Sequence, residues 1–117
     1  MIVNRGDVVL AFYPFSAGTG GGRRPVLVVQ SDAYNRRIHN TVVAQITTNL
    51  RRASDPAHLL IEVATPDGQQ TGLLHDSVAS CLNLATITDD RIDRVIGRFS
   101  AAFMEQIDAC LKVALGL

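Results

Sequence analysis

Short apolar runs dominate the first two-thirds of the chain, and each is too short for a typical helix. They are rich in β-branched residues and bounded by turn-forming residues, a pattern that predicts strands of a sheet. The runs cover residues 7–13, 25–30, 41–48, 58–63 and 77–82. Because no long helical pattern separates them, we expect an antiparallel, strongly curved sheet or small barrel rather than alternating strands and helices.

Helical signals come late in the chain. Thr88 is suited to cap a short helix that runs through Val95. Asp89 and Asp90 fall in the first turn of this segment, where the helix dipole favours acidic residues. We expect the helix to end at Gly97.

Ser100 is suited to cap a second, longer helix. Its apolar residues recur at helical spacing, and they are Phe103, Ile107, Leu111 and Ala114. Glu105, Asp108 and Lys112 then face water, so the pattern predicts an amphipathic helix that lies on the sheet. A shorter helical turn is expected at residues 31–35, between the second and third strands.

The composition is that of one globular domain, residues 1–117, with 47% apolar and 19% charged residues. No apolar run approaches the about 18 residues that a membrane-spanning helix needs, and the N-terminus lacks the pattern of a signal peptide. We therefore expect a cytoplasmic protein that does not associate with membranes. Cys81 and Cys110 lie far apart in the sequence without a CxxC pair, so we expect buried thiols rather than a disulfide scaffold or a zinc site.

The formal net charge is zero, which by itself argues against a nucleic-acid partner. The charge is uneven along the chain, however. Residues 1–60 hold seven arginines and three aspartates, a net charge of +4, whereas residues 61–117 hold four basic and eight acidic residues, a net charge of −4. Arginine pairs at 23–24, 36–37 and 51–52 either form an anion-binding face or are separately solvated.

A glycine-rich segment, residues 18–25, precedes the second predicted strand. It is not a phosphate-binding P-loop, because no lysine with a following Ser or Thr comes after it and a strand rather than a helix is predicted next. Two interpretations remain. The segment is either a flap that delivers Arg24 to an anion, with Pro25 restricting the backbone after it, or a long hairpin loop with two exposed arginines.

Five segments resemble, in order and spacing, those of the MazF/PemK family of toxin endoribonucleases. They are residues 5–8 (RGDV), 21–32 (GGRRPVLVVQSD), 46–48 (ITT), 72–78 (GLLHDSV) and 85–88 (ATIT). The last two look like the family's final strand and its connection to the C-terminal helices. The resemblance therefore extends over almost the whole chain.

The resemblance implies a mainly β fold with C-terminal helices. This is a small SH3-like or CcdB-like barrel of five to seven antiparallel strands with a long C-terminal helix. It further implies a homodimer that cleaves single-stranded RNA, often mRNA, at a short sequence without a metal or other cofactor. The implied partner is a cognate, MazE-like antitoxin with an acidic C-terminal tail.

The resemblance also implies the catalytic residues. The family's arginine before the proline of the RPV segment and its threonine at the end of the third strand match Arg24 and Thr47. Some members also use an arginine and an aspartate in the last strand, where this chain has Ser80 and Leu82. That version of the mechanism cannot apply here unchanged.

Metal-free RNA cleavage uses the 2′-hydroxyl as an internal nucleophile and yields a 2′,3′-cyclic phosphate and a 5′-hydroxyl. A group must accept the 2′-proton, another must stabilise the phosphorane charge, and a third must protonate the leaving oxygen. The Arg24 guanidinium suits the second role, and the Thr47 hydroxyl can orient the same phosphate. The general base is not identified. His39, His58 and His75 form no HxxxH or HExxH pair, so a metal site is not expected, and none of the three is assigned as the base.

Other polar residues are candidates for RNA binding rather than catalysis. They are Arg23, Gln30, Arg36, Arg37, Asn49, Arg51 and Arg52. The arginines suit backbone contacts, and the two amides suit base edges, as does Asn40. Tyr13, Phe15 and Tyr34 are possible stacking surfaces. Two other functions remain open, a non-catalytic toxin of the same fold that poisons DNA gyrase and a plain nucleic-acid-binding barrel.

Overall fold

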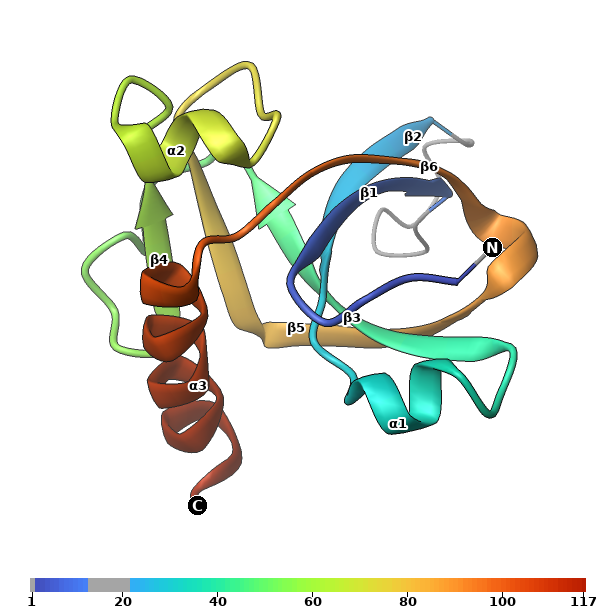
Figure 1. Ribbon diagram of the computed structural model, residues 1–117. Coiled ribbons are helices and arrows are strands. Elements are labelled where there is room, and N and C mark those ends of the chain that lie inside the picture. The colour runs from blue at the N-terminus through green and yellow to red at the C-terminus, as the bar shows by residue number, and fades with distance from the viewer. Residues whose placement is uncertain (1, 13–21) are drawn as a thin grey trace.

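The computed structural model describes residues 2–12 and 22–117, so Tyr13, Phe15 and the glycine-rich residues 18–21 lie outside the described residues. Within these described ranges, six strands and three α-helices follow one another (Figure 1). The elements are β1 (Asp7–Phe12), β2 (Arg23–Val28), α1 (Asp32–Asn35), β3 (Asn40–Thr47), β4 (His58–Ile61), α2 (Pro66–Gln70), β5 (Ser77–Thr88), the 3₁₀ turn η1 (Asp89–Arg91), β6 (Ile92–Arg98) and α3 (Ala101–Leu115).

The strands form one antiparallel sheet in the order β4-β5-β3-β2-β1-β6. Figure 1 shows the sheet curling round on itself, with the long strand β5 running along its base. The edge strands are β4 and β6, so the sheet does not close within the described residues. The predicted mainly β class, the strand number and the antiparallel, strongly curved sheet are confirmed.

The predicted helix from Thr88 to Val95 is wrong beyond Arg91. Asp89–Arg91 form a single 3₁₀ turn, and the chain then enters strand β6, which pairs with β1 from Ala11↔Ile92 to Asp7↔Arg98. The acidic residues favour helix only in the first turn. Pairing with the otherwise exposed edge of β1 satisfies the backbone of the whole segment, and its β-branched residues suit a strand.

Residue 97 lies within β6 and does not end a helix, and a Cβ there would come within 2.3–2.5 Å of the Thr71 and Gln70 backbones. Only glycine allows this close approach. The strand expected at 77–82 also continues to Thr88, because β3 pairs with it as far as Asn40↔Thr88. It is therefore not the final strand that the family resemblance suggested, since β6 follows it.

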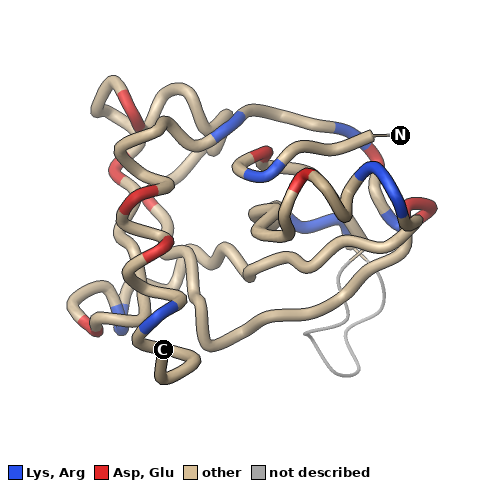
Figure 2. The backbone as a smooth tube through the Cα atoms, turned by 60° about the horizontal axis from the view of Figure 1, so that its bottom comes forward, with Lys and Arg blue, Asp and Glu red and all other residues tan. Residues whose placement is uncertain are grey.

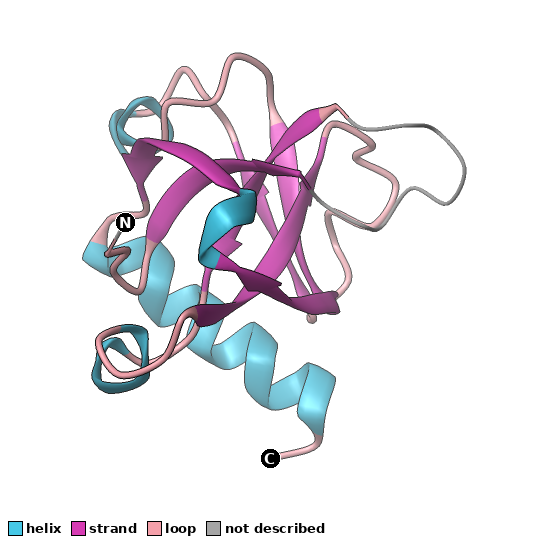
Figure 3. Ribbon diagram, turned by 90° about the vertical axis from the view of Figure 1, so that its right-hand side faces the viewer, coloured by secondary structure: helices cyan, strands magenta, loops and turns pink. Residues whose placement is uncertain are grey.

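Helix α3 begins where the sequence predicts, with the Ser100 side chain accepting a hydrogen bond from the Phe103 N–H. Gly116 ends it in the left-handed conformation. Phe103, Ile107 and Cys110 are buried against one face of the sheet, whereas Leu111 and Ala114 are only partly buried. Figure 3 shows α3 running along the outside of the sheet. The predicted amphipathic helix is confirmed.

Two apolar clusters lie on opposite faces of the sheet. The larger one, which includes Leu27, Ala44 and Ile46, packs against α3. The other, which includes Val26 and Val43, lies inside the curl of β1, β2, β3 and β6. Since side chains alternate along a strand, β3 contributes to both clusters, and its odd-numbered residues point away from α3.

The short helical turn at α1 is confirmed, with the Ser31 side chain accepting from the Ala33 N–H. Helix α2 was not predicted, because Pro66-Asp67-Gly68 indicates only a turn. Thr65 caps it by accepting from the Gly68 N–H, and a Cβ on Gly68 would lie 1.9 Å from the Glu62 carbonyl oxygen. The end of α2 is held against β6.

Candidate nucleic-acid interface

Gln45 and Thr47 place polar side chains on the sheet face opposite α3. Both follow Val43 at alternating positions of β3, so they continue the inner face of the curl where its apolar cluster ends. Two pockets open here, and both are lined by Gln45 and Thr47. The end of β3 therefore forms the centre of a polar groove.

The first pocket, called the Arg24 pocket, has a volume of about 300 Å³. Its lining residues are Arg24, Pro25, Gln45, Ile46, Thr47, Thr48 and Ser77. The β2–β3 pairing ends at Val26↔Gln45, and Arg24 and Thr47 each lie two residues beyond it, on the same face of their strands as Val26 and Gln45. The two predicted catalytic residues therefore line the same pocket from neighbouring strands.

The second pocket, called the Arg51 pocket, has a volume of about 490 Å³. Its lining residues are Gln45, Thr47, Asn49, Arg51, Arg52, His58, Val78, Ser80 and Asn83. The turn after β3 is ordered by side chains of this set. The Thr47 hydroxyl oxygen accepts from the Asn49 N–H at 3.1 Å, and the Asn49 amide oxygen accepts from the Arg51 N–H at 3.1 Å. Thr47 thereby keeps its own O–H available for a ligand.

A hydrogen-bonded series of polar side chains lies along the wall of the Arg51 pocket. Asp55 Oδ2 is 2.7 Å from His58 Nδ1, His58 Nε2 is 3.0 Å from Ser80 Oγ, and the Asn83 amide donates to Ser80 Oγ at 3.0 Å. The hydrogen bond from His58, and next the one from the Ala57 N–H, lower the pKa of Asp55. Asp55 is therefore a carboxylate at neutral pH.

The strand geometry explains why this series exists. His58 lies opposite Ser80 in the β4–β5 pairing, and Ser80 lies opposite Gln45 in the β3–β5 pairing. One row of side chains thus crosses three strands. Beside Ser80 the register shifts between Ala44 and Gln45, and this bulge of β5 carries Asn83 into the pocket.

The structure brings together only part of the predicted RNA-binding set. Asn49, Arg51 and Arg52 line the Arg51 pocket beside Thr47. Arg36 and Arg37 lie next to α1, before the first residue of β3, so about 20 Å of extended strand separates them from Thr47.

Two further residues of that set are engaged within the fold. The Gln30 amide donates to the Asn35 side chain at 2.9 Å and to the Asn40 carbonyl oxygen at 2.8 Å. Arg23 forms an ion pair of 2.5 Å with Asp93 of β6. Arg23 is still half exposed, whereas Gln30 primarily supports the loop between β2 and β3.

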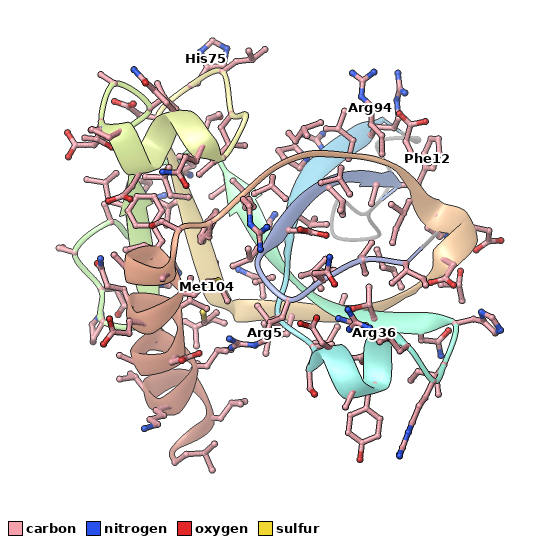
Figure 4. The ribbon with its side chains drawn as sticks, in the orientation of Figure 1. Arg5, Phe12, Arg36, His75, Arg94 and Met104 are labelled. Carbon is pink, nitrogen blue, oxygen red and sulfur yellow. The ribbon has the colours of Figure 1, made fainter. Side chains whose placement is uncertain are left out.

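Folding partly cancels the charge asymmetry of the sequence. Arg5 pairs with Asp108 and Arg23 with Asp93, so two arginines of the basic half meet acids of the acidic half. Figure 2 shows acidic residues spaced along α3 and a mixture of both signs around the other end of the molecule, while Figure 4 shows the Arg5 side chain reaching toward α3. Among the described residues, no ion pair involves Arg24, Arg51 or Arg52. These cations are the ones available in the groove.

A third, mainly apolar pocket of about 370 Å³ adjoins the Arg24 pocket and shares Pro25, Thr48 and Ser77 with it. Leu74, which is 86% exposed, lines it together with Arg94. Figure 4 shows His75, another lining residue, on the same side of the molecule as Arg94.

Gln45, Ser80 and Asn83 were missed as site residues, and His58 was not assigned a role. The signal for Gln45 was present, since it lies two residues before Thr47 on a predicted strand and must share its face. Ser80 and His58 become neighbours only through strand pairing. Both cysteines are buried free thiols, as predicted, and burial raises the pKa of Cys81 to about 12, which makes it an inert thiol.

No group of three or more His, Cys, Asp or Glu side chains is arranged to hold a metal ion in residues 2–12 and 22–117. The same residues include no helix that is long and apolar enough to cross a membrane.

Comparison with known proteins gives consistent matches over the whole chain. A family model described as PemK-like, MazF-like toxin of type II toxin-antitoxin system matches residues 4–115. Endoribonuclease EndoA of Bacillus subtilis (strain 168) is 36% identical over 118 residues, which covers 100% of this chain and 97% of the relative.

Solved structures give the same result for the fold. An endoribonuclease in complex with its cognate antitoxin from a mycobacterial species superposes with a TM-score of 0.78 at 26% identity, covering 98% of this chain and 96% of that one. A MazE–MazF complex from Deinococcus radiodurans has a TM-score of 0.76 at 18% identity, with 100% and 99% covered.

Proposed function

Since this chain belongs to the PemK-like, MazF-like toxins of type II toxin–antitoxin systems, we propose that it is an endoribonuclease that cuts single-stranded RNA, mRNA included, in the cytoplasm. The observation that carries the proposal is the pairing of Arg24 and Thr47 in one pocket of about 300 Å³. A free guanidinium beside a strand-held hydroxyl is suited to a phosphodiester.

The reaction is an attack by the 2′-hydroxyl on the adjacent phosphorus, which yields a 2′,3′-cyclic phosphate and a 5′-hydroxyl end. Arg24 donates two parallel hydrogen bonds to non-bridging oxygens and stabilises the charge that develops on them. Thr47 donates its O–H to the same phosphate, while the Asn49 N–H holds its oxygen in position. These residues carry the chemistry without a metal ion.

RNA binding follows the groove formed by the Arg24 and Arg51 pockets. Arg51 and Arg52 contact the backbone on one side of the cut, and Asn49 contacts a base edge. Arg23 contacts the backbone outside the groove, since it faces the other side of β2 from Arg24 and pairs with Asp93 there. Arg36 and Arg37 contact only RNA that continues past the groove, so their removal weakens binding less than removal of Arg51.

The protein acts as a homodimer and is neutralised by a cognate, MazE-like antitoxin. Two similar solved structures are complexes of a toxin with its antitoxin. An acidic antitoxin tail matches the unpaired arginines of the groove and would exclude RNA by occupying it. The apolar pocket around Leu74 offers the surface that a second copy covers.

Incubation of the purified protein with a long RNA in excess EDTA tests this proposal. Cleavage at a recurring short sequence, with 2′,3′-cyclic phosphate and 5′-hydroxyl ends, is the expected result. Intact RNA would contradict it, and inhibition of DNA gyrase in a supercoiling assay would then identify the alternative activity. RNA binding without cleavage would identify a non-catalytic barrel.

A further inference from the structure

In the hydrogen-bonded series Asp55–His58–Ser80, the donor and the acceptor of each bond can be assigned. Asp55 is ionised, and a carboxylate only accepts hydrogen bonds, so the 2.7 Å contact requires the proton of the neutral imidazole to lie on Nδ1. Nε2 is then an acceptor, and the Ser80 O–H donates to it across 3.0 Å. The series therefore runs in one direction, from the Ser80 hydroxyl in the pocket through the buried imidazole to the Asp55 carboxylate, which is partly exposed.

Ser80 Oγ has one remaining acceptor site. A hydroxyl oxygen has two lone pairs, and the Asn83 amide uses one of them. The other is available to a donor in the Arg51 pocket, which Ser80 lines together with Thr47. Ser80 is diagonal to Thr47 across the β3–β5 pair, a separation of about 7 Å between Cα atoms.

The buried His58 imidazole is held in one orientation. The His58 side chain is 2% exposed, and its two ring nitrogens are both hydrogen-bonded, so the ring cannot turn without losing both contacts. The charged and titratable groups around it are Asp55 on its own segment and Arg51 and Arg52 on the pocket wall. The Cys110 thiol of α3 lies near Asp55, and its pKa is raised by burial and by that carboxylate.

We propose that Ser80, backed by His58 and Asp55, accepts the proton of the attacking 2′-hydroxyl, which is one of the roles that Arg24 and Thr47 leave unfilled. This inference rests on the proposed function. Ser80 contacts the substrate, whereas His58 and Asp55 act through it. A series of this kind is typical of sites that activate a hydroxyl.

The proton transfers balance as follows. The O2′–phosphorus bond forms while the 2′-proton moves to Ser80 Oγ and the Ser80 proton moves to His58 Nε2. The phosphorus–O5′ bond breaks, and its electron pair leaves with O5′, which takes a proton from water. The imidazolium, stabilised by the Asp55 carboxylate, then returns its proton to Ser80 Oγ as the Ser80 hydroxyl gives a proton to the hydroxide so formed.

Single-turnover cleavage of an oligoribonucleotide that spans a mapped cut site tests the inference. We expect Ser80→Ala and His58→Gln each to lower the rate constant for cleavage by 10²–10⁴-fold, the usual contribution of a general base. Asp55→Asn still accepts from Nδ1 but lacks the charge, so its loss should be about tenfold. The Kd for the same oligonucleotide with a 2′-O-methyl group at the cut should change less than threefold.

The pH profile distinguishes proton transfer from a structural role. In the wild type, the rate should fall on the acid side as one proton is taken up, and this limb should be absent from His58→Gln. The matched control is His39→Gln, which removes an exposed histidine whose Nδ1 lies 3.2 Å from Asp89 Oδ2 at the opposite end of β3. It should leave both the rate and the profile unchanged.

Two results would contradict the proposed role of Ser80. Rates of Ser80→Ala and His58→Gln within threefold of wild type would do so, and so would slow variants that keep the acid limb. These results are distinct from failure of the proposed function, because the wild type would still cut RNA and Arg24→Ala would not. If the wild type cuts no RNA, both proposals are wrong.

Discussion

Replacement of Arg24 by alanine is the sharpest test of the candidate site. The side chain is exposed at the start of β2, and no ion pair of the described residues involves it. Its removal should therefore change the free energy of unfolding by less than about 0.5 kcal/mol, which for a domain of 117 residues is a Tm change within about 2 °C. Any large loss of activity must then come from the site itself.

The size of the loss of activity follows from the number of hydrogen bonds that the guanidinium can donate. Removing one preorganised donor from a developing oxyanion costs about 10²–10³-fold in rate, and Arg24 is positioned to supply two. We expect Arg24→Ala to lower the single-turnover rate at least about 10³-fold, which is about 4 kcal/mol of transition-state stabilisation. Arg24→Lys keeps the charge but loses the bidentate geometry, so it should remain about 10²-fold below wild type.

The assay is single-turnover cleavage of an oligoribonucleotide that contains a mapped cut site, with calorimetric melting of each variant. Arg91→Ala is the control, because Arg91 is an exposed arginine in η1, which adjoins the first residues of β3 and not Thr47. Cleavage by Arg24→Ala within tenfold of the wild-type rate at the same bond would contradict the catalytic role of Arg24. A Tm loss of several degrees would show instead that Arg24 supports the fold.

Three further changes test the packing and electrostatics. Ile107→Ala, in the fully buried face of α3, should destabilise the protein by about 3 kcal/mol and lower Tm by about 12 °C in calorimetry. Gly72→Ala should cost more than about 2 kcal/mol in denaturant unfolding, since the residue has φ +73° and a Cβ would lie 2.1 Å from the Ile96 carbonyl oxygen. Asp55→Asn should lower Tm at pH 7, and this difference should shrink on acidification. The bond from His58 lowers the pKa of Asp55 below its ordinary value of 3.8, so the stabilisation is complete above that value and is lost as pH falls through the lower, folded-state pKa.

Each of these changes has a control or a contrary result. Glu105→Ala alters the exposed face of α3 and should leave Tm nearly unchanged, and Gly22→Ala adds a Cβ that meets no described atom within 4 Å. If Ile107→Ala melts like Glu105→Ala, the helix does not pack on the sheet as described. A Tm difference for Asp55→Asn that widens at low pH would contradict the ionised carboxylate.

Local patterns were sufficient for most elements of the fold. Ser100 and the spacing of Phe103 and Ile107 predicted α3 correctly, because a cap and an amphipathic face are properties of one segment. Residues 92–95 were predicted wrongly as helix. Their strand conformation depends on pairing with β1, which lies about 85 residues earlier in the chain.

In the candidate site, too, some residues could be found from the sequence and others only from the structure. The family resemblance, confirmed by the match to residues 4–115, pointed to Arg24 and Thr47, which the fold brings to one pocket; their catalytic role stays a prediction. The sequence alone could not assign a role to His58, because the role of a single histidine depends on the residues that bond to its ring nitrogens. Asp55 and Ser80 become those partners only through a turn and a strand pairing.

The sequence by itself determined the strands with buried β-branched residues, the C-terminal helix and the family, since these depend on local periodicity and on the order of motifs. Only the tertiary structure decided which arginines are free and which are paired. The charge of +4 in the first half is reduced when Arg5 and Arg23 meet acids of the second half. Electrostatic and hydrogen-bonding partners act over a few ångströms in space, and separation along the chain does not predict that distance.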